Sequence, residues 1–152
     1  MNATSTPAPS EATTSLVSHF LQSYEANAAS RDLPSLLSQF SDPFMAAGPT
    51  GVQCLRATDF ASALSKRIQL FSGLGAQPSK LVSCHETRLD DRFVMAETRW
   101  HMTFIREGQS TKEAFADSLF ILDMAAESPK IIFYLAHQDL VATLRDLGIL
   151  PA

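Results

Sequence analysis

The stretch EAFADSLFIL, residues 113–122, otherwise looks like a core strand of a sheet, but it contains an acid near its middle. Burying an unpaired carboxylate is costly, because the charge loses its hydration. Asp117 therefore either faces water or belongs to a site that needs it. The choice depends on how this strand pairs with its neighbours, and on what lies on each face of the sheet.

The surrounding segment, residues 79–138, predicts four long strands in succession. Breaks fall at Asp90–Asp91, at Glu107–Gly108 and at 125–129. Short turns between consecutive strands are typical of an antiparallel meander. The second half of the chain is therefore expected to form one sheet.

The first half predicts helices instead. Apolar residues recur at helical spacing over 12–29 and place Tyr24 on the buried side of that helix. Capping residues and glycines then predict helices that start at Asp32, run from Thr58 to Gly73, and run from Asp139 to Gly148. The predicted architecture is α+β, with three N-terminal helices on a curved, mainly antiparallel sheet and a short C-terminal helix.

Length and composition limit the possible partners. A chain of 152 residues predicts a single domain at 11–152, after a disordered tail at 1–10 that is rich in Ser, Thr, Pro and Ala. The net charge of −4 offers no attraction to nucleic acid or anionic membranes. Charged residues make up 18% of the chain. An average soluble domain has about 25%, so we expect a second subunit to cover some of the apolar surface.

The sequence predicts no metal or cofactor. Its four histidines lie on different predicted elements, and the two cysteines, Cys54 and Cys84, are expected to be small core thiols. No secretory signal and no apolar run of about 18 residues occurs. A cytoplasmic protein without membrane contact is therefore expected.

Two-residue turns at Asp90–Asp91 and Glu107–Gly108 predict the register of the sheet. In that register Thr98 lies between Ser83 and Asp117, and all three share the face that packs under the helices. The same face is expected to carry His85 and further pocket residues, which are Trp100, Met102, Phe104 and Phe115, whereas the five-residue connection at 125–129 leaves the faces of the last strand open. The other face is expected to form a homodimer. A slip of one residue would exchange the two faces.

Three segments resemble the nuclear transport factor 2-like superfamily, also called SnoaL-like, which includes the steroid Δ-isomerases. They are SYEANAASRDLPSLLSQF at 23–40, the turn and helix at 48–71, and KIIFYLAHQDLVATLRDLG at 130–148. Their order and spacing follow the family over about residues 14–148. The resemblance implies a conical α+β fold around an internal pocket, with Tyr134 of the last strand pointing into that pocket.

The resemblance also implies roles for individual residues. Tyr24 and Asp117 match the isomerases' oxyanion-binding pair, in which a protonated acid and a phenol polarise a ligand oxygen. The position of the catalytic base falls on Gly48, which has no group that takes a proton. His85 is a candidate acid or base, because imidazole changes charge near neutral pH.

Three functions stay open from the sequence. The chain is an isomerase- or cyclase-like enzyme acting on a hydrophobic carbonyl compound, or a protein that binds such a compound without chemistry. The third possibility is an association module that uses the outer face of the sheet to dimerise or to dock another protein. The missing base favours binding over catalysis.

Overall fold

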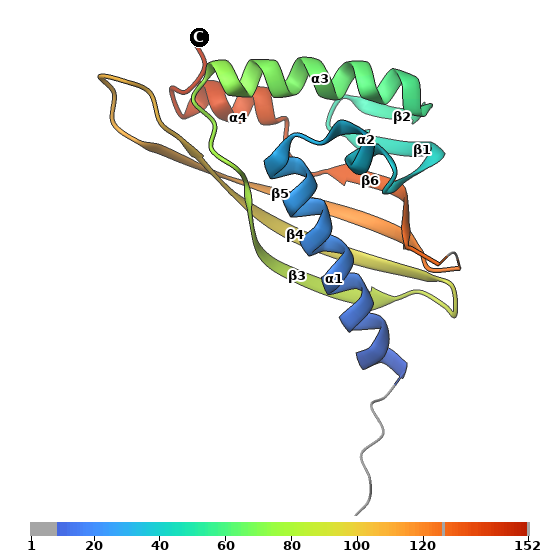
Figure 1. Ribbon diagram of the computed structural model, residues 1–152. Helices are drawn as coiled ribbons and strands as arrows, with labels where there is room; N and C mark the ends of the chain where they lie inside the picture. The colour runs from blue at the N-terminus through green and yellow to red at the C-terminus, as the bar shows by residue number, and fades with distance from the viewer. Residues whose placement is uncertain (1–8, 126, 152) are drawn as a thin grey trace, which may run out of the picture.

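The computed structural model describes residues 9–125 and 127–151 (Figure 1). Residues 1–8 of the predicted tail lie outside the described part, whereas Pro9 and Ser10 already belong to the first helix. The helices gather on one side of a curved sheet, with α1 running across its face and α3 and α4 along one end (Figure 1). The predicted α+β architecture is confirmed.

Two of the helices begin where a capping side chain satisfies one of their first backbone N–H groups. The carboxylates of Asp32 and Asp139 accept hydrogen bonds from Ser35 N and Ala142 N, as their N-cap positions predict. The sequence places the cap of the third helix at Thr58, but its N-cap position is Arg56, two residues earlier, and Arg56 makes no side-chain cap bond. The bounds are α1 Pro9–Ser30, α2 Leu33–Leu37, α3 Ala57–Gly73 and α4 Leu140–Asp146.

The sheet has six strands in the order β2-β1-β6-β5-β4-β3. All neighbours are antiparallel except β1 and β6, which run parallel. The last four strands form the predicted meander, and β6 joins it to the hairpin made by the first two strands. The bounds are β1 Phe40–Gly48, β2 Gly51–Leu55, β3 Lys80–Arg88, β4 Phe93–Phe104, β5 Lys112–Asp123 and β6 Lys130–Ala136.

The predicted turn between β3 and β4 is one residue too short. Leu89 N donates to Phe93 O at 2.9 Å, and the Asp90 carboxylate accepts from the N–H groups of Arg92 and Phe93. This local bonding holds a wider loop. The pairing of β3 with β4 is therefore shifted by one residue over most of the hairpin, so that His85 lies opposite Glu97 instead of Ala96. An irregularity between Leu81 and Ser83 restores the predicted register only at the far end of β3.

The predicted turn between β4 and β5 is also one residue too short. β4 and β5 pair up to Phe104 and Lys112, so the residues between them form a long loop rather than a turn at Glu107–Gly108. The end of β4 bonds instead to the segment before β3, where Ile105 N donates to Gly75 O at 2.9 Å. The register is thus shifted by one residue along the whole of β5.

This shift places Asp117 on the outer face of the sheet. Asp117 lies opposite Arg99, and Thr98 lies opposite Ser118. Buried residues alternate with more exposed ones along β4, and these buried residues form the inner face, under the helices. The predicted face is therefore right for β4 and wrong for β5, whose core residues are Ala114, Ser118, Phe120 and Leu122.

The inner face carries two separate hydrophobic clusters. The first lies under α1 and α2 and includes Phe20, Phe40 and Phe120. The second lies under α4 and the end of α3 and includes Met102, Phe104 and Leu144. Neither cysteine belongs to them: Cys54 and Cys84 are both exposed free thiols, so their prediction as core residues is wrong.

Candidate ligand-binding site

A strip of small and polar residues separates the two clusters on the inner face. It consists of Thr98 and Trp100 on β4, Ala116 and Ser118 on β5, and Ala136 on β6, which pairs with Ser118. The side chain of Tyr134 adjoins the strip, with its ring centroid 5.2 Å from that of Phe120. The strip therefore offers short side chains and hydroxyl groups in the middle of an otherwise apolar surface.

Three of these polar groups satisfy one another. Trp100 Nε1 donates to Thr98 Oγ1 at 2.9 Å, and Thr98 Oγ1 lies 2.8 Å from Ser118 Oγ and 3.1 Å from Ser118 O. Thr98 and Ser118 are buried, with 4% and 5% of their surface exposed. A buried polar group is costly unless it has a partner, so this network fixes the orientation of the indole ring.

Tyr24 extends from α1 over this strip. Its ring centroid lies 5.8 Å from that of Trp100 and 5.4 Å from that of Phe120. Burial, reinforced by the nearby phenol of Tyr134, raises the pKa of Tyr24, while Arg67 acts weakly in the opposite direction. The phenol therefore keeps its proton at neutral pH. Within the described part of the chain, its hydroxyl makes no hydrogen bond to another residue, although the side chain stays partly accessible.

Helix α3 lies along one end of the sheet without packing tightly on it. Every residue of Ala57–Gly73 keeps some exposed surface, including the apolar side formed by Phe60, Leu64, Ile68 and Phe71. Helices that pack fully on a sheet normally bury such a stripe. The helix therefore presents apolar surface that the protein itself does not cover completely.

The predicted oxyanion pair does not form. Tyr24 lies on the inner face, and Asp117 lies on the outer face with 38% of its side chain exposed. Asp117 Oδ1 is 3.7 Å from Arg99 Nη1, and Gln138 Nε2 donates to Asp117 Oδ2 at 3.4 Å. The sheet itself separates the acid from the phenol. The reason that the opening stretch accommodates an acid is that this position faces outward.

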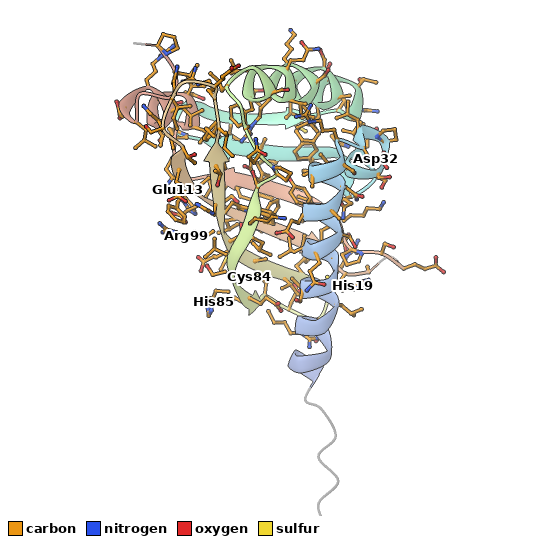
Figure 2. All side chains as sticks on the ribbon, turned by 60° about the vertical axis from the view of Figure 1, so that its left-hand side comes forward. His19, Asp32, Cys84, His85, Arg99 and Glu113 are labelled. Atoms are coloured by element: carbon orange, nitrogen blue, oxygen red, sulfur yellow. The ribbon has the colours of Figure 1, made fainter. Side chains whose placement is uncertain are left out.

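Other predicted site residues are divided between the faces. On the outer side, together with Asp117, lie Ser83, His85 and Phe115. In agreement with this, Figure 2 shows His85, Arg99 and Glu113 pointing away from α1. Met102 and Phe104 are inner residues but belong to the second hydrophobic cluster. The predicted site residues that meet at the strip are Thr98, Trp100, Tyr24 and Tyr134.

The sequence interpretation missed Ser118 and Ala116. Both were assigned outward by the predicted register, and both in fact face the helices beside Thr98 and Trp100. The signal available was the type of side chain: Ser118 directly follows Asp117, and a hydroxyl is far easier to bury than a carboxylate.

The part of the chain that the structure describes contains neither a metal cluster nor a membrane helix. Residues 9–125 and 127–151 bring together no group of three His, Cys, Asp or Glu side chains suited to a metal ion. In the same residues, no helix combines the length and the apolar character needed to cross a bilayer.

Solved structures share this fold at low sequence identity. No family model matches the chain, and no curated protein matches it. A nuclear transport factor 2-like protein with a cystatin-like fold from Novosphingobium aromaticivorans superposes with a TM-score of 0.69, at 12% identity, covering 88% of this chain and 87% of that one. The chain therefore has the nuclear transport factor 2-like fold, which the resemblance in its sequence implied.

Two further structures with the same fold have different described roles. A putative polyketide cyclase from Xanthomonas campestris pv. campestris gives a TM-score of 0.55 at 16% identity, covering 86% of this chain and 95% of that one. The beta subunit of benzoate 1,2-dioxygenase from Burkholderia mallei gives 0.66 at 11% identity, covering 83% and 90%. The fold thus occurs both in a cyclase-like protein and in a subunit of a larger enzyme, and it does not specify one function.

Proposed function

We propose that the protein binds a small hydrophobic molecule over the strip between its two clusters, with Tyr24 as the hydrogen-bond donor to an oxygen of that molecule. The observation that carries this proposal is the phenol of Tyr24, which keeps its proton and has no partner among the described residues. The hydroxyl is not a buried unsatisfied group, so it stays accessible and can donate its hydrogen bond to a ligand carbonyl in place of water.

The surroundings of Tyr24 suit a flat, apolar ligand. The ring of Trp100 lies beside that of Tyr24, the ring of Tyr134 adjoins the strip, and α3 has an apolar side that is incompletely buried. Small-molecule sites are mostly apolar, with a few polar groups that fix orientation. Ala116 and Ala136 would leave room for the ligand where larger side chains would fill the space.

Binding is favoured over acid–base catalysis because the groups proposed for chemistry lie elsewhere. Asp117 and His85 are on the outer face, and the position of the family's base is Gly48. A general acid or base must come within about 3 Å of the proton that it transfers. Tyr24 alone would polarise a carbonyl but would not move a proton between carbon atoms.

Calorimetric titration with fluorenone and with fluorene, which lacks the carbonyl, tests the proposed site. Tyr24→Phe is expected to weaken binding of the ketone about fivefold, corresponding to one net hydrogen bond of about 1 kcal/mol. Binding of the hydrocarbon should not change. Quenching of Trp100, the single tryptophan, provides a second readout at the strip itself.

Asp117→Asn serves as the matched control, because it removes a charge from the other face. It is expected to leave the affinity for both compounds unchanged. The proposal would be rejected if neither compound bound, or if Asp117→Asn weakened ketone binding as much as Tyr24→Phe.

Self-association through the outer face is a second candidate function. The apolar residues Leu119, Ile121, Phe133 and Leu135 form adjacent cross-strand pairs on that face, and Met45 beside them is 43% exposed. A contiguous apolar patch on a sheet marks an interaction surface. We infer that a second copy of the chain covers it, in agreement with the low proportion of charged residues.

A further inference from the structure

A hollow of about 390 Å³ adjoins the apolar pairs of the outer face. It crosses β3, β4 and β5, reaches His137 just beyond β6, and is bordered by polar residues, which are Ser83, His85, Glu97, Arg99, Asp117 and His137. Ser83, Arg99 and Asp117 form one cross-strand row, and His85 and Glu97 lie in the next. The hollow therefore has both signs of charge at its border.

Arg99 and Asp117 are incompletely paired within one chain. Their closest atoms are 3.7 Å apart, and their side chains are 48% and 38% exposed. The guanidinium also lies over Phe115, with Cζ 4.6 Å from the ring centroid, which holds it beside the hollow. A guanidinium has five N–H donors and a carboxylate accepts several hydrogen bonds, so both groups keep capacity for a further partner.

A positive group directly beside a negative one is self-complementary under a two-fold axis. In such an interface, residue i of one copy contacts residue j of the other, and the same contact occurs a second time. We propose that Arg99 of each copy enters the hollow of the other copy and pairs there with Asp117. This inference rests on the self-association proposed above, and it specifies the contacts that orient the two sheets.

The position of the hollow supports a second copy as its occupant. Leu119 lies opposite Glu97 on one side and Leu135 on the other, so the polar border is continuous with the apolar surface already proposed to be covered. If a second copy covers that surface, the polar borders of the two hollows come together. Like charges facing each other would oppose association, whereas reciprocal pairing of Arg99 with Asp117 removes the conflict.

Charge reversal tests the pairing directly by sedimentation velocity over a range of protein concentrations. Arg99→Glu and Asp117→Arg are each expected to raise the dissociation constant of the homodimer at least tenfold, because like charges then face each other. An equimolar mixture of the two variants should form a heterodimer with near wild-type affinity. In that mixture, one copy carries two carboxylates and the other two guanidinium groups, so both contacts are attractive.

Lys66→Glu on α3 reverses a charge on the helical side of the sheet and is expected to leave the dissociation constant unchanged. A wild-type protein that stays monomeric would overturn both the self-association and this pairing. A wild-type dimer unaffected by either reversal, or one whose variants fail to recover when mixed, would overturn the pairing alone.

If circular dichroism shows that a reversal variant is unfolded, Arg99→Gln and Asp117→Asn replace the pair. Each is then expected to weaken the dimer about threefold, and an unchanged dissociation constant would overturn the pairing.

Discussion

Thr98 is the residue on which the polar network of the inner face depends. Its hydroxyl accepts from the indole of Trp100 and also contacts both the side chain and the backbone of Ser118. Removing it would leave the Trp100 N–H in an apolar environment without its partner. At a buried position of this kind, leaving a polar group unpaired changes the free energy of unfolding more than the hydrogen bond itself contributes to it.

Thr98→Val is expected to lower the free energy of unfolding by about 1–3 kcal/mol, since it leaves a buried donor unsatisfied. Urea unfolding followed by the fluorescence of Trp100 measures this. Thr98→Ser keeps the hydroxyl and should lose clearly less stability. Equal losses in the two variants would show that the methyl group, and not the hydroxyl, matters at this position.

Cys84 has a thiol whose reactivity is suppressed by its surroundings. Burial, with a smaller contribution from the charge of Glu86, raises the pKa of Cys84 to about 11. The thiolate is the reactive form, so the thiol reacts slowly at neutral pH although it lies on an edge strand. Its exposure alone would suggest a more reactive group.

In a Cys54→Ser variant, the alkylation rate of Cys84 should rise about tenfold per pH unit above pH 8, in proportion to the thiolate fraction. The rate is expected to level off only near pH 11. Iodoacetamide labelling followed by mass spectrometry measures it, and the unfolded chain should level off near pH 8.5, the usual value for cysteine. A folded protein with the same profile as the unfolded chain would contradict the expected effect of burial.

Among the elements, the segment between α3 and β3 packs closely against the end of β4. Gly75 has φ +78°, a conformation that favours glycine, and a Cβ there would lie 2.0 Å from Ile105 O. This close approach allows Ile105 N to donate to Gly75 O. Together with the bridge between Ala76 and Phe104, the contact attaches this segment to the edge of β4 that also pairs with β3.

Gly75→Ala is expected to destabilise the protein by at least about 2 kcal/mol, through both the clash and the unfavourable backbone conformation. Urea unfolding gives the value. Gly73→Ala is the matched control, because a Cβ there meets no atom within 4 Å. It should be neutral or slightly stabilising at the end of α3. Similar losses for both substitutions would contradict the role assigned to the close approach.

At the scale of the whole molecule, the two faces of the sheet have separate tasks. The inner face supports the helices and the proposed ligand site, and the outer face is proposed to meet a second copy. The two tasks depend on different residues of the same strands, because successive side chains point to opposite sides. Substitutions on one face should therefore leave the function of the other face intact.

Leu119→Lys is expected to raise the dissociation constant of the homodimer at least tenfold, because each copy would bury a charge in place of about 2 kcal/mol of apolar contact. Ketone binding should be unchanged. Val141→Lys on α4 replaces an apolar side chain that is 38% exposed away from that face and is expected to have no effect on association. Sedimentation velocity distinguishes the two, and equal behaviour would contradict association through the sheet.

The sequence by itself determined the order of the elements, the caps at Asp32 and Asp139 and the inward position of Tyr24. These features depend on local signals: a side chain that bonds to backbone groups a few residues away, or an apolar stripe at helical spacing. The alternation along β4 was equally readable, because its outward positions carry Glu97, Arg99 and His101.

Only the tertiary structure decided the face on which Asp117 lies. Both sides of β5 carry large apolar residues, with Phe115, Leu119 and Ile121 on one and Phe120 and Leu122 on the other, so hydrophobic alternation does not select a register there. The register depends instead on the loops, where the Asp90 carboxylate bonds to Arg92 N and Phe93 N, and where Gln109 N donates to Arg106 O. A difference of one residue in these connections moved the acid to the other side of the sheet from the phenol.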